Sequence, residues 1–330
     1  MLLREELFSS REKAYEMPSV VYHYCSMDSF LSILESSSLR LSNITKSNDP
    51  TEITNVIPVL QEVTTSVLLD YNQKLSGSYR FAPDTISKLI SRFFEELSKN
   101  FYVICFSEKR DLLSQWDRYA DRANGIAIGF NTRHFIKLQL ETSSQYVFGK
   151  IIYDRKVLAD SVDHFLRKQI NSAWRPEDDC YNVNLIENAT TNLVCTVLRY
   201  SVLFKDAFFA EESEWRLVYN PLGRIRGLGY ASAYHDRLIE VNQYRYEQSG
   251  FVRQACKFKV IRENSISSYV DLDFSSVRDA LIQEIVIGPK SPLMPTDKDL
   301  QLFLAIHGYK LSTLRMEGKL VLSKSDKPFQ

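Results

Sequence analysis

The 330-residue sequence lacks a long hydrophobic run, because no apolar stretch approaches the roughly 20 residues that a membrane-spanning helix needs. It lacks a secretory leader pattern as well, since its first residues, MLLREELFSSREK, are highly charged. Net charge is also absent, because 41 basic residues balance 41 acidic ones. A partner held mainly by counterion release, such as bulk DNA, is therefore not expected. We expect a cytoplasmic protein that has no membrane partner.

The sequence lacks the cysteine patterns of a disulfide framework or a zinc site. It has five widely spaced cysteines and no C-x-x-C pair: Cys25, Cys105, Cys180, Cys195 and Cys256. This arrangement is typical of reduced, mostly buried thiols, and we expect Cys105 to be one of them. Three catalytic motifs are missing too, namely H-E-x-x-H, the nucleophile elbow and the P-loop.

The remaining pattern predicts an α+β fold. With 44% hydrophobic and 25% charged residues, the composition is that of an ordinary globular protein. Apolar runs that begin at Val20, Phe101, Ile126 and Glu214 predict strands, which we expect to share one mixed sheet. We predict a single domain over 1–330, in which 1–18 form an N-terminal lead-in. Helical spacing around residues 155–209 predicts a helical insertion or lid.

The densest polar chemistry follows the predicted strand 101–106. Ser107 and Glu108 end this strand, and two interpretations remain open: the segment 107–111 caps the next helix, or it lines a pocket. In that helix Trp116 and Tyr119 share one face with the leucines before them. Residues 124–125 (Asn-Gly) predict a left-handed turn before the strand 126–130.

A histidine and a pair of glutamates are further candidates for a site. His23 lies between two tyrosines in the first strand and should point to the opposite face from both. It is either a hydrogen-bonded core residue or a ligand contact. Glu212 and Glu214 stand two apart at a strand start, which would place both carboxylates on one face. They are either a solvated strand end or an acid/base pair.

Five blocks of this sequence resemble, in order, a bacterial family catalogued as domain of unknown function 2971. The central block is CFSE, then W-x-x-Y-A-D, then G-I-A-I-G-F, within residues 105–130. The other blocks are VYHY at 21–24, LRLS with NDPTE at 39–52, ESEWRL at 212–217, and IVIGP at 285–289. The family name implies no activity.

The chain order of strand histidine, strand-end serine and Glu-x-Glu pair also resembles ADP-ribosyltransferases. This resemblance implies a mixed-sheet core of that type and NAD as substrate. It implies that His23 holds the nicotinamide side of NAD and that Ser107 supports the site. Glu214 would bind a ribose hydroxyl and stabilise an oxocarbenium-like transition state, and Glu212 would lie nearest the acceptor. The sequence departs from that family in lacking the S-T-S motif and the early-strand arginine.

From the same resemblance we assign Tyr24, Trp116 and Tyr119 to the NAD-binding side of the site. The implied activity is ADP-ribosyl transfer to a protein or nucleic acid, or NAD hydrolysis by water, as a bacterial toxin or phage-defence effector. Two alternatives stay open. The first is a non-catalytic nucleotide-sensing module. The second is a metal-dependent nuclease, in which Mg²⁺ is held by these carboxylates: Asp49, Glu52, Glu212 and Glu214.

Overall fold

The chain divides into two compact units. The computed structural model describes residues 17–46, 53–76, 101–142, 145–220, 244–261, 265–312 and 319–328, with 84, 87, 88, 90–92 and 94 between 77 and 100. A helical unit comprises Met1–Tyr15, Ile44–Phe101 and Ile152–Phe209, and a sheet unit comprises Glu16–Asn43, Tyr102–Ile151 and Ala210–Gln330. Most of the predicted lead-in 1–18 lies outside the described residues.

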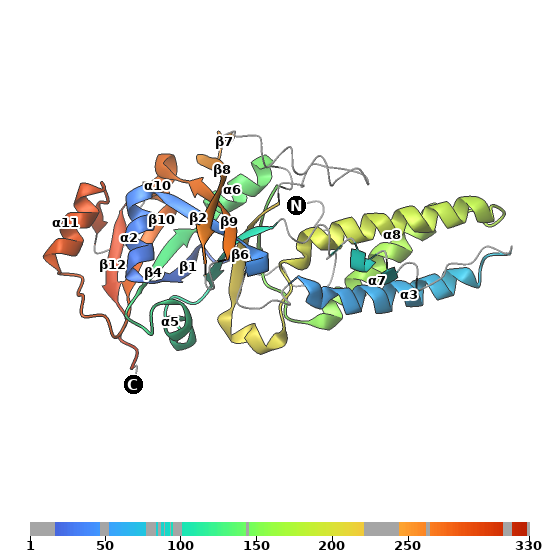
Figure 1. Ribbon diagram of the computed structural model, residues 1–330, viewed down its shortest axis with the longest axis horizontal. Helices are drawn as coiled ribbons and strands as arrows, with labels where there is room; N and C mark the ends of the chain where they lie inside the picture. Colours follow the sequence, from blue (N-terminus) through green and yellow to red (C-terminus); the bar gives the residue numbers. More distant parts are fainter. Residues whose placement is uncertain are drawn as a thin grey trace. The chain divides into compact units, whose positions relative to one another are not determined.

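The helical unit is built on α3 (Ile57–Asn72), α7 (Arg155–Asn171) and α8 (Asp179–Ser201). α7 packs against both α3 and α8, and the three run alongside one another (Figure 1). Apolar side chains at helical spacing form the buried face of α7: Leu158, Val162, Phe165, Leu166 and Ile170. Where the sequence predicts an insertion at 155–209, the structure groups these residues with 44–101, because α7 covers α3. No helix within the described part of the chain meets the length and hydropathy of a membrane span.

The sheet unit contains one mixed sheet, as predicted. The described strands are ordered β11-β12-β10-β4-β1-β3-β2-β9-β8-β7, and β6 joins β3 to β5. Their bounds are β1 Val20–Cys25, β2 Ser38–Asn43, β3 Tyr102–Ser107, β4 Ile126–Asn131, β5 Tyr146–Lys150, β6 Glu214–Tyr219, β7 Tyr244–Tyr246, β8 Phe251–Val260, β9 Ile266–Asp273, β10 Ile282–Ile287, β11 Leu311–Ser312 and β12 Leu320–Lys324. β12 runs parallel to β10 and β11, and the other pairs are antiparallel. The four strands predicted to share a sheet do so.

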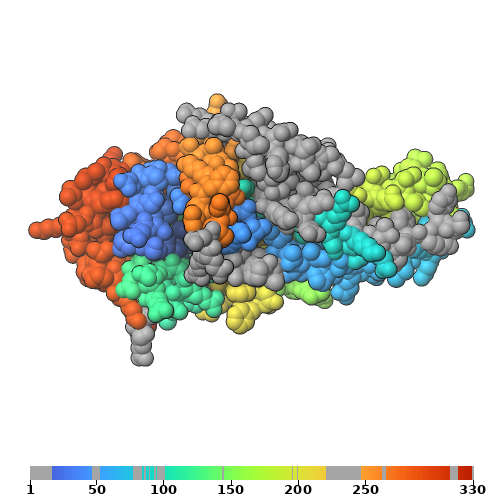
Figure 2. All heavy atoms as spheres, viewed as in Figure 1, coloured from blue at the N-terminus to red at the C-terminus, as the bar shows by residue number. Residues whose placement is uncertain are grey.

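Short helices flank this sheet. They are α2 (Met27–Ser36), α5 (Leu113–Tyr119), α6 (Thr132–Thr142), α10 (Arg278–Leu281) and α11 (Lys298–Ile306), with a 3₁₀ turn at η6 Ser275–Val277. Two further 3₁₀ turns, η1 Ile44–Lys46 and η2 Thr54–Val56, belong to the helical unit, and η4 Ala207–Glu212 spans the boundary between the units. α2 begins after Ser26, whose hydroxyl accepts the Ser29 N–H, and it buries Phe30, Ile33 and Leu34. The blue surface of α2 lies next to the orange surface of β8 and β9 in Figure 2.

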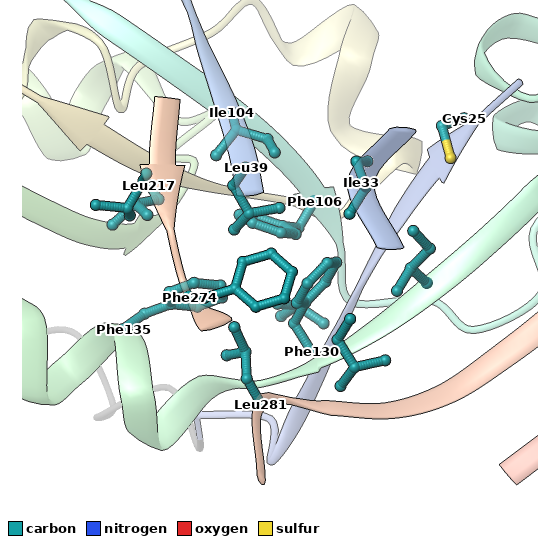
Figure 3. Close-up of a cluster of buried hydrophobic side chains, with 14 of the residues drawn as sticks. Cys25, Ile33, Leu39, Ile104, Phe106, Phe130, Phe135, Leu217, Phe274 and Leu281 are labelled. Carbon is teal, nitrogen blue, oxygen red and sulfur yellow. The ribbon is translucent and has the colours of Figure 1, made fainter. Parts of the chain in front are cut away.

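Alternation along the strands produces two hydrophobic clusters. On one face Phe106, Phe130 and Phe135 form the aromatic centre of the larger cluster, with ring centroids 5.2–6.2 Å apart. Figure 3 shows these rings together with Phe274, gathered from two strands, α6 and the end of β9. Tyr22 and Tyr24 point to the other face, into a smaller cluster with Trp116.

The turn after α5 differs from the prediction. The left-handed residues are Asp121, Arg122 and Ala123, with φ of 47°, 50° and 73°, rather than Asn124 and Gly125. Gly125 is needed for space instead, since a Cβ there would overlap the Cys25 carbonyl oxygen and approach the Ala120 backbone. The atom that approaches Gly125 belongs to β1, and the residues of the turn itself do not reveal this contact.

Replacing Gly125 by alanine should therefore lower the free energy of unfolding by about 1–3 kcal/mol or more, the usual cost of an overpacked site. Arg122→Gly is the matched control, because glycine tolerates the left-handed conformation that Arg122 adopts. Urea unfolding of both variants measures the difference. Equal stability of Gly125→Ala and the wild type would contradict the close approach.

The prediction of mostly buried cysteines is wrong for the described thiols. Cys25 is buried, Cys256 is half-buried, and Cys105 and Cys180 are exposed. Cys105 alternates with core residues Ile104 and Phe106, so it lies on the other face of β3. Burial raises the pKa of the Cys25 thiol to about 12, so this thiol is inert at neutral pH.

Candidate active site

Most of the predicted site residues meet where β3 ends and β6 begins. Ser107 and Glu214 are directly paired across the two strands. The Ser107 hydroxyl donates to the Glu212 carbonyl oxygen at 2.8 Å and accepts the Lys109 N–H at 3.1 Å. We call the group of Ser107, Arg118, Tyr119, Glu212, Glu214 and Arg216 the carboxylate cluster.

Glu214 is a buried carboxylate held by an arginine. It is 4% exposed, and its two oxygens accept Nε of Arg216 at 2.6 Å and Nη2 at 3.2 Å. Both side chains lie on one face of β6, because residues two apart in a strand point the same way. A two-point contact of this kind fixes the plane of the carboxylate and favours its ionised form.

Glu212 is also buried, at 3% exposure, and it has its own partners. Its Oε1 accepts Nη1 of Arg118 and the hydroxyl of Tyr119, both at 3.1 Å. Glu212 ends η4, and Ser213 has a left-handed φ of 45°. We predicted that Glu212 and Glu214 share one face because both belong to a strand. This reason is wrong, since only Glu214 belongs to the strand.

Tyr24 and Trp116 support the loop that carries Ser107. The rings meet edge to face with centroids 4.8 Å apart, and Trp116 is 0% exposed. The Tyr24 hydroxyl donates to the Lys109 carbonyl and accepts the Leu112 N–H, while the Trp116 indole donates to Asp111 at 2.6 Å. Burial raises the pKa of Tyr24, so its hydroxyl stays protonated.

The loop 107–111 does not cap the next helix. α5 begins after Leu112, which makes no side-chain cap, and the loop side chains bind elsewhere. Glu108 accepts Lys150 Nζ at 2.7 Å and the indole of Trp215 at 3.4 Å. Burial raises the pKa of Glu108, but these hydrogen bonds together with the charges of Lys150 and Lys109 outweigh it, and the net pKa lies below the ordinary value. The capping interpretation is therefore wrong.

His23 is not part of this cluster. It points to the opposite face of β1 from Tyr24, and its ring contacts Phe106 of the larger core with centroids 6.0 Å apart. Its Nδ1 lies 2.9 Å from the Cys105 carbonyl oxygen. Burial lowers the pKa of His23, against the effect of that hydrogen bond, so the ring is neutral at pH 7.

The metal-site alternative receives no support from the described residues. Among them, no three histidine, cysteine or acidic side chains converge to hold a cation. Glu212 and Glu214 are each paired with an arginine instead. Asp49 and Glu52 lie outside the described residues.

Sequence reasoning missed the two arginines of the cluster. Arg216 is 1% exposed in an otherwise apolar strand segment, WRLVY. A charged residue in such a strand needs a partner, and Glu214 two residues before it is the nearest candidate. The sequence therefore could have predicted the pair of Arg216 and Glu214. Arg118 gives no comparable signal, because half-exposed helix arginines are ordinary.

One family model matches the chain. It is described as "Protein of unknown function (DUF2971)" and matches residues 115–217, which include Trp116, Tyr119, Glu212 and Glu214. This match supports the resemblance to that family. Comparisons with the curated proteins and with the solved structures each found no match. The resemblance to ADP-ribosyltransferases stays a prediction.

Proposed function

We propose that the carboxylate cluster binds the nicotinamide ribose of NAD and promotes cleavage of its N-glycosidic bond. The observation that carries this proposal is Glu214, a buried carboxylate whose plane Arg216 fixes. Bond cleavage expels neutral nicotinamide and leaves positive charge on the ribose. A carboxylate that is already ionised and oriented can stabilise that charge without reorganising.

The neighbouring groups suit the remaining steps. Tyr119 is 38% exposed and Arg118 is about half exposed, so both reach solvent while they hold the buried Glu212. An aromatic ring and a guanidinium at the surface can contact a pyridinium ring and a diphosphate respectively. Glu212 stands two residues before Glu214, and in this proposal its carboxylate accepts the proton of an attacking water or hydroxyl.

The acceptor of ADP-ribose and the cellular role are inferred only from the resemblance to ADP-ribosyltransferases. ADP-ribose would pass to a protein, a nucleic acid or water, in a bacterial cytoplasm, as a toxin or a phage-defence activity. His23 has no part in the proposed chemistry, because it faces away from Tyr24 and from the loop that carries Ser107.

The test is a nicotinamide-release assay beside a calorimetric titration of NAD on the purified protein. We expect saturable NAD binding and release of nicotinamide, with cell lysate supplied as a source of acceptor. Protein that neither binds NAD nor releases nicotinamide would end the proposal. Binding without turnover would favour the nucleotide-sensing module.

A further inference from the structure

A cavity of about 640 Å³ opens in the sheet unit beside α2. Its walls come from α2, β2, β8 and β9, and His23 and Ile104 also line it. The surfaces of α2 and of β8 and β9 adjoin in Figure 2. This volume lies within the usual range for small-molecule sites, roughly 300–1,000 Å³. Among the described residues, the cavity shares no lining side chain with the carboxylate cluster.

The cavity arises where two strands share one edge of β3. β6 pairs along one edge of β3, so β1 and β2 both occupy the other. β1 pairs with β3 at Ser107, and β2 pairs with β3 at Tyr102 and Val103. The stretch of β3 between these pairs is left as a gap between β1 and β2. His23 bridges this gap through the Cys105 carbonyl. A carbonyl only accepts hydrogen bonds, so Nδ1 carries the proton and Nε2 is the acceptor nitrogen.

One end of the cavity is rich in positive charge. Asp271 accepts Arg40 Nε at 3.4 Å and Lys257 Nζ at 3.1 Å, so one carboxylate serves two cations. Lys259 adds a third cation and forms no ion pair with the described residues. Burial is the main cause that lowers the pKa of Lys259; the charge of Arg40 lowers it further, and the charge of Asp271 opposes both. An anion bound there would relieve this repulsion.

The helix side of the cavity presents hydroxyl groups. Ser29, Ser32 and Ser36 follow one another at spacings of three and four along α2, so they lie on one face. Two further acids line the cavity, Asp28 and Asp273. Asp28 lies in the first turn of α2, where the helix dipole stabilises it, and Asp273 accepts the Ser275 N–H. Serine hydroxyls and carboxylates are the usual partners of sugar hydroxyls.

We propose that this cavity binds a small sugar phosphate of the ribose 5-phosphate type. The phosphate lies at the end formed by Arg40, Lys257 and Lys259, and the sugar hydroxyls face the serines of α2. The inference is independent of NAD cleavage at the carboxylate cluster. It gives the chain a second ligand site.

The test is calorimetry with ribose 5-phosphate at one ionic strength, with inorganic phosphate and ribose as comparison probes. We expect saturable binding that is tighter than for either comparison probe. Lys259→Met should weaken it about tenfold or more, because a charge-assisted contact to the phosphate is lost. Lys137→Met is the matched control, since Lys137 is exposed on α6 and does not line the cavity. Ser32→Val should weaken ribose 5-phosphate binding and leave inorganic phosphate binding unchanged.

Three results would overturn the proposal: no saturable binding, equal weakening by Lys259→Met and Lys137→Met, or binding no tighter than that of inorganic phosphate. Thermal melts establish that each variant is folded. The ion pairs of Asp271 are with Arg40 and Lys257, and Lys259 feels this carboxylate only as a more distant charge, so its replacement should change the melting temperature little. No NAD is present, and failure of NAD cleavage therefore leaves this outcome unaffected.

Discussion

Replacement of Trp116 by alanine should lower the free energy of unfolding by about 3–5 kcal/mol, the usual cost of removing a buried tryptophan. Trp116 is 0% exposed, and its contacts join α5 to β1 and to the loop before α5. It packs in the smaller cluster, meets Tyr24 edge to face, and donates to Asp111. Truncation leaves a cavity and also removes a hydrogen-bond partner from the loop that carries Ser107.

Urea unfolding measures this loss, and Trp116→Phe is the matched comparison. Phenylalanine keeps most of the ring packing but cannot donate to Asp111, so a smaller loss is expected. If Trp116→Ala were fully stable and lost NAD binding, Trp116 would be a stacking platform for the ligand. Its complete burial in the structure argues against that role.

Periodicity predicted the four strands around the site because the core residues there are nearly all apolar. β1, β4 and β6 begin at the predicted residues, which are Val20, Ile126 and Glu214, and β3 begins one residue after the predicted Phe101. The meeting of Ser107 with Glu214 was also predictable, since both stand at the ends of strands expected in one sheet. What the pattern could not supply was the pairing order of the strands.

Two predictions about the site were wrong, because each depended on structure that the sequence pattern does not show. His23 alternates with Tyr22 and Tyr24, and the sequence does not say which face belongs to the loop of Ser107. In the structure that face belongs to the tyrosines, because Trp116 packs against them. The left-handed Ser213 separates the two glutamates, and a non-glycine residue gives no warning of that conformation.

The largest functional effect is expected for Glu214→Gln. Glutamine keeps the shape and one accepting oxygen but loses the charge. If Glu214 acts on positive charge that develops only as the glycosidic bond breaks, the change should affect turnover far more than affinity. We expect NAD to bind within roughly tenfold of wild type, about 1.4 kcal/mol, while turnover falls by roughly a hundredfold or more.

The matched control is Glu284→Gln in β10. Glu284 is likewise buried, at 3% exposure, and it accepts Arg110 Nε at 2.8 Å and the Tyr22 hydroxyl at 3.0 Å. Both variants remove the charge of a buried carboxylate that is paired with an arginine, so both should lose stability. Only Glu214→Gln should lose turnover per folded molecule.

The most direct measurement is therefore nicotinamide release per folded molecule, set beside the calorimetric dissociation constant for NAD, in wild type, Glu214→Gln and Glu284→Gln at one salt concentration. The account predicts near-equal dissociation constants in all three and a hundredfold lower rate, approximately, in Glu214→Gln alone. Equal rates in wild type and Glu214→Gln, or equal losses in the two variants, would contradict a catalytic role for Glu214.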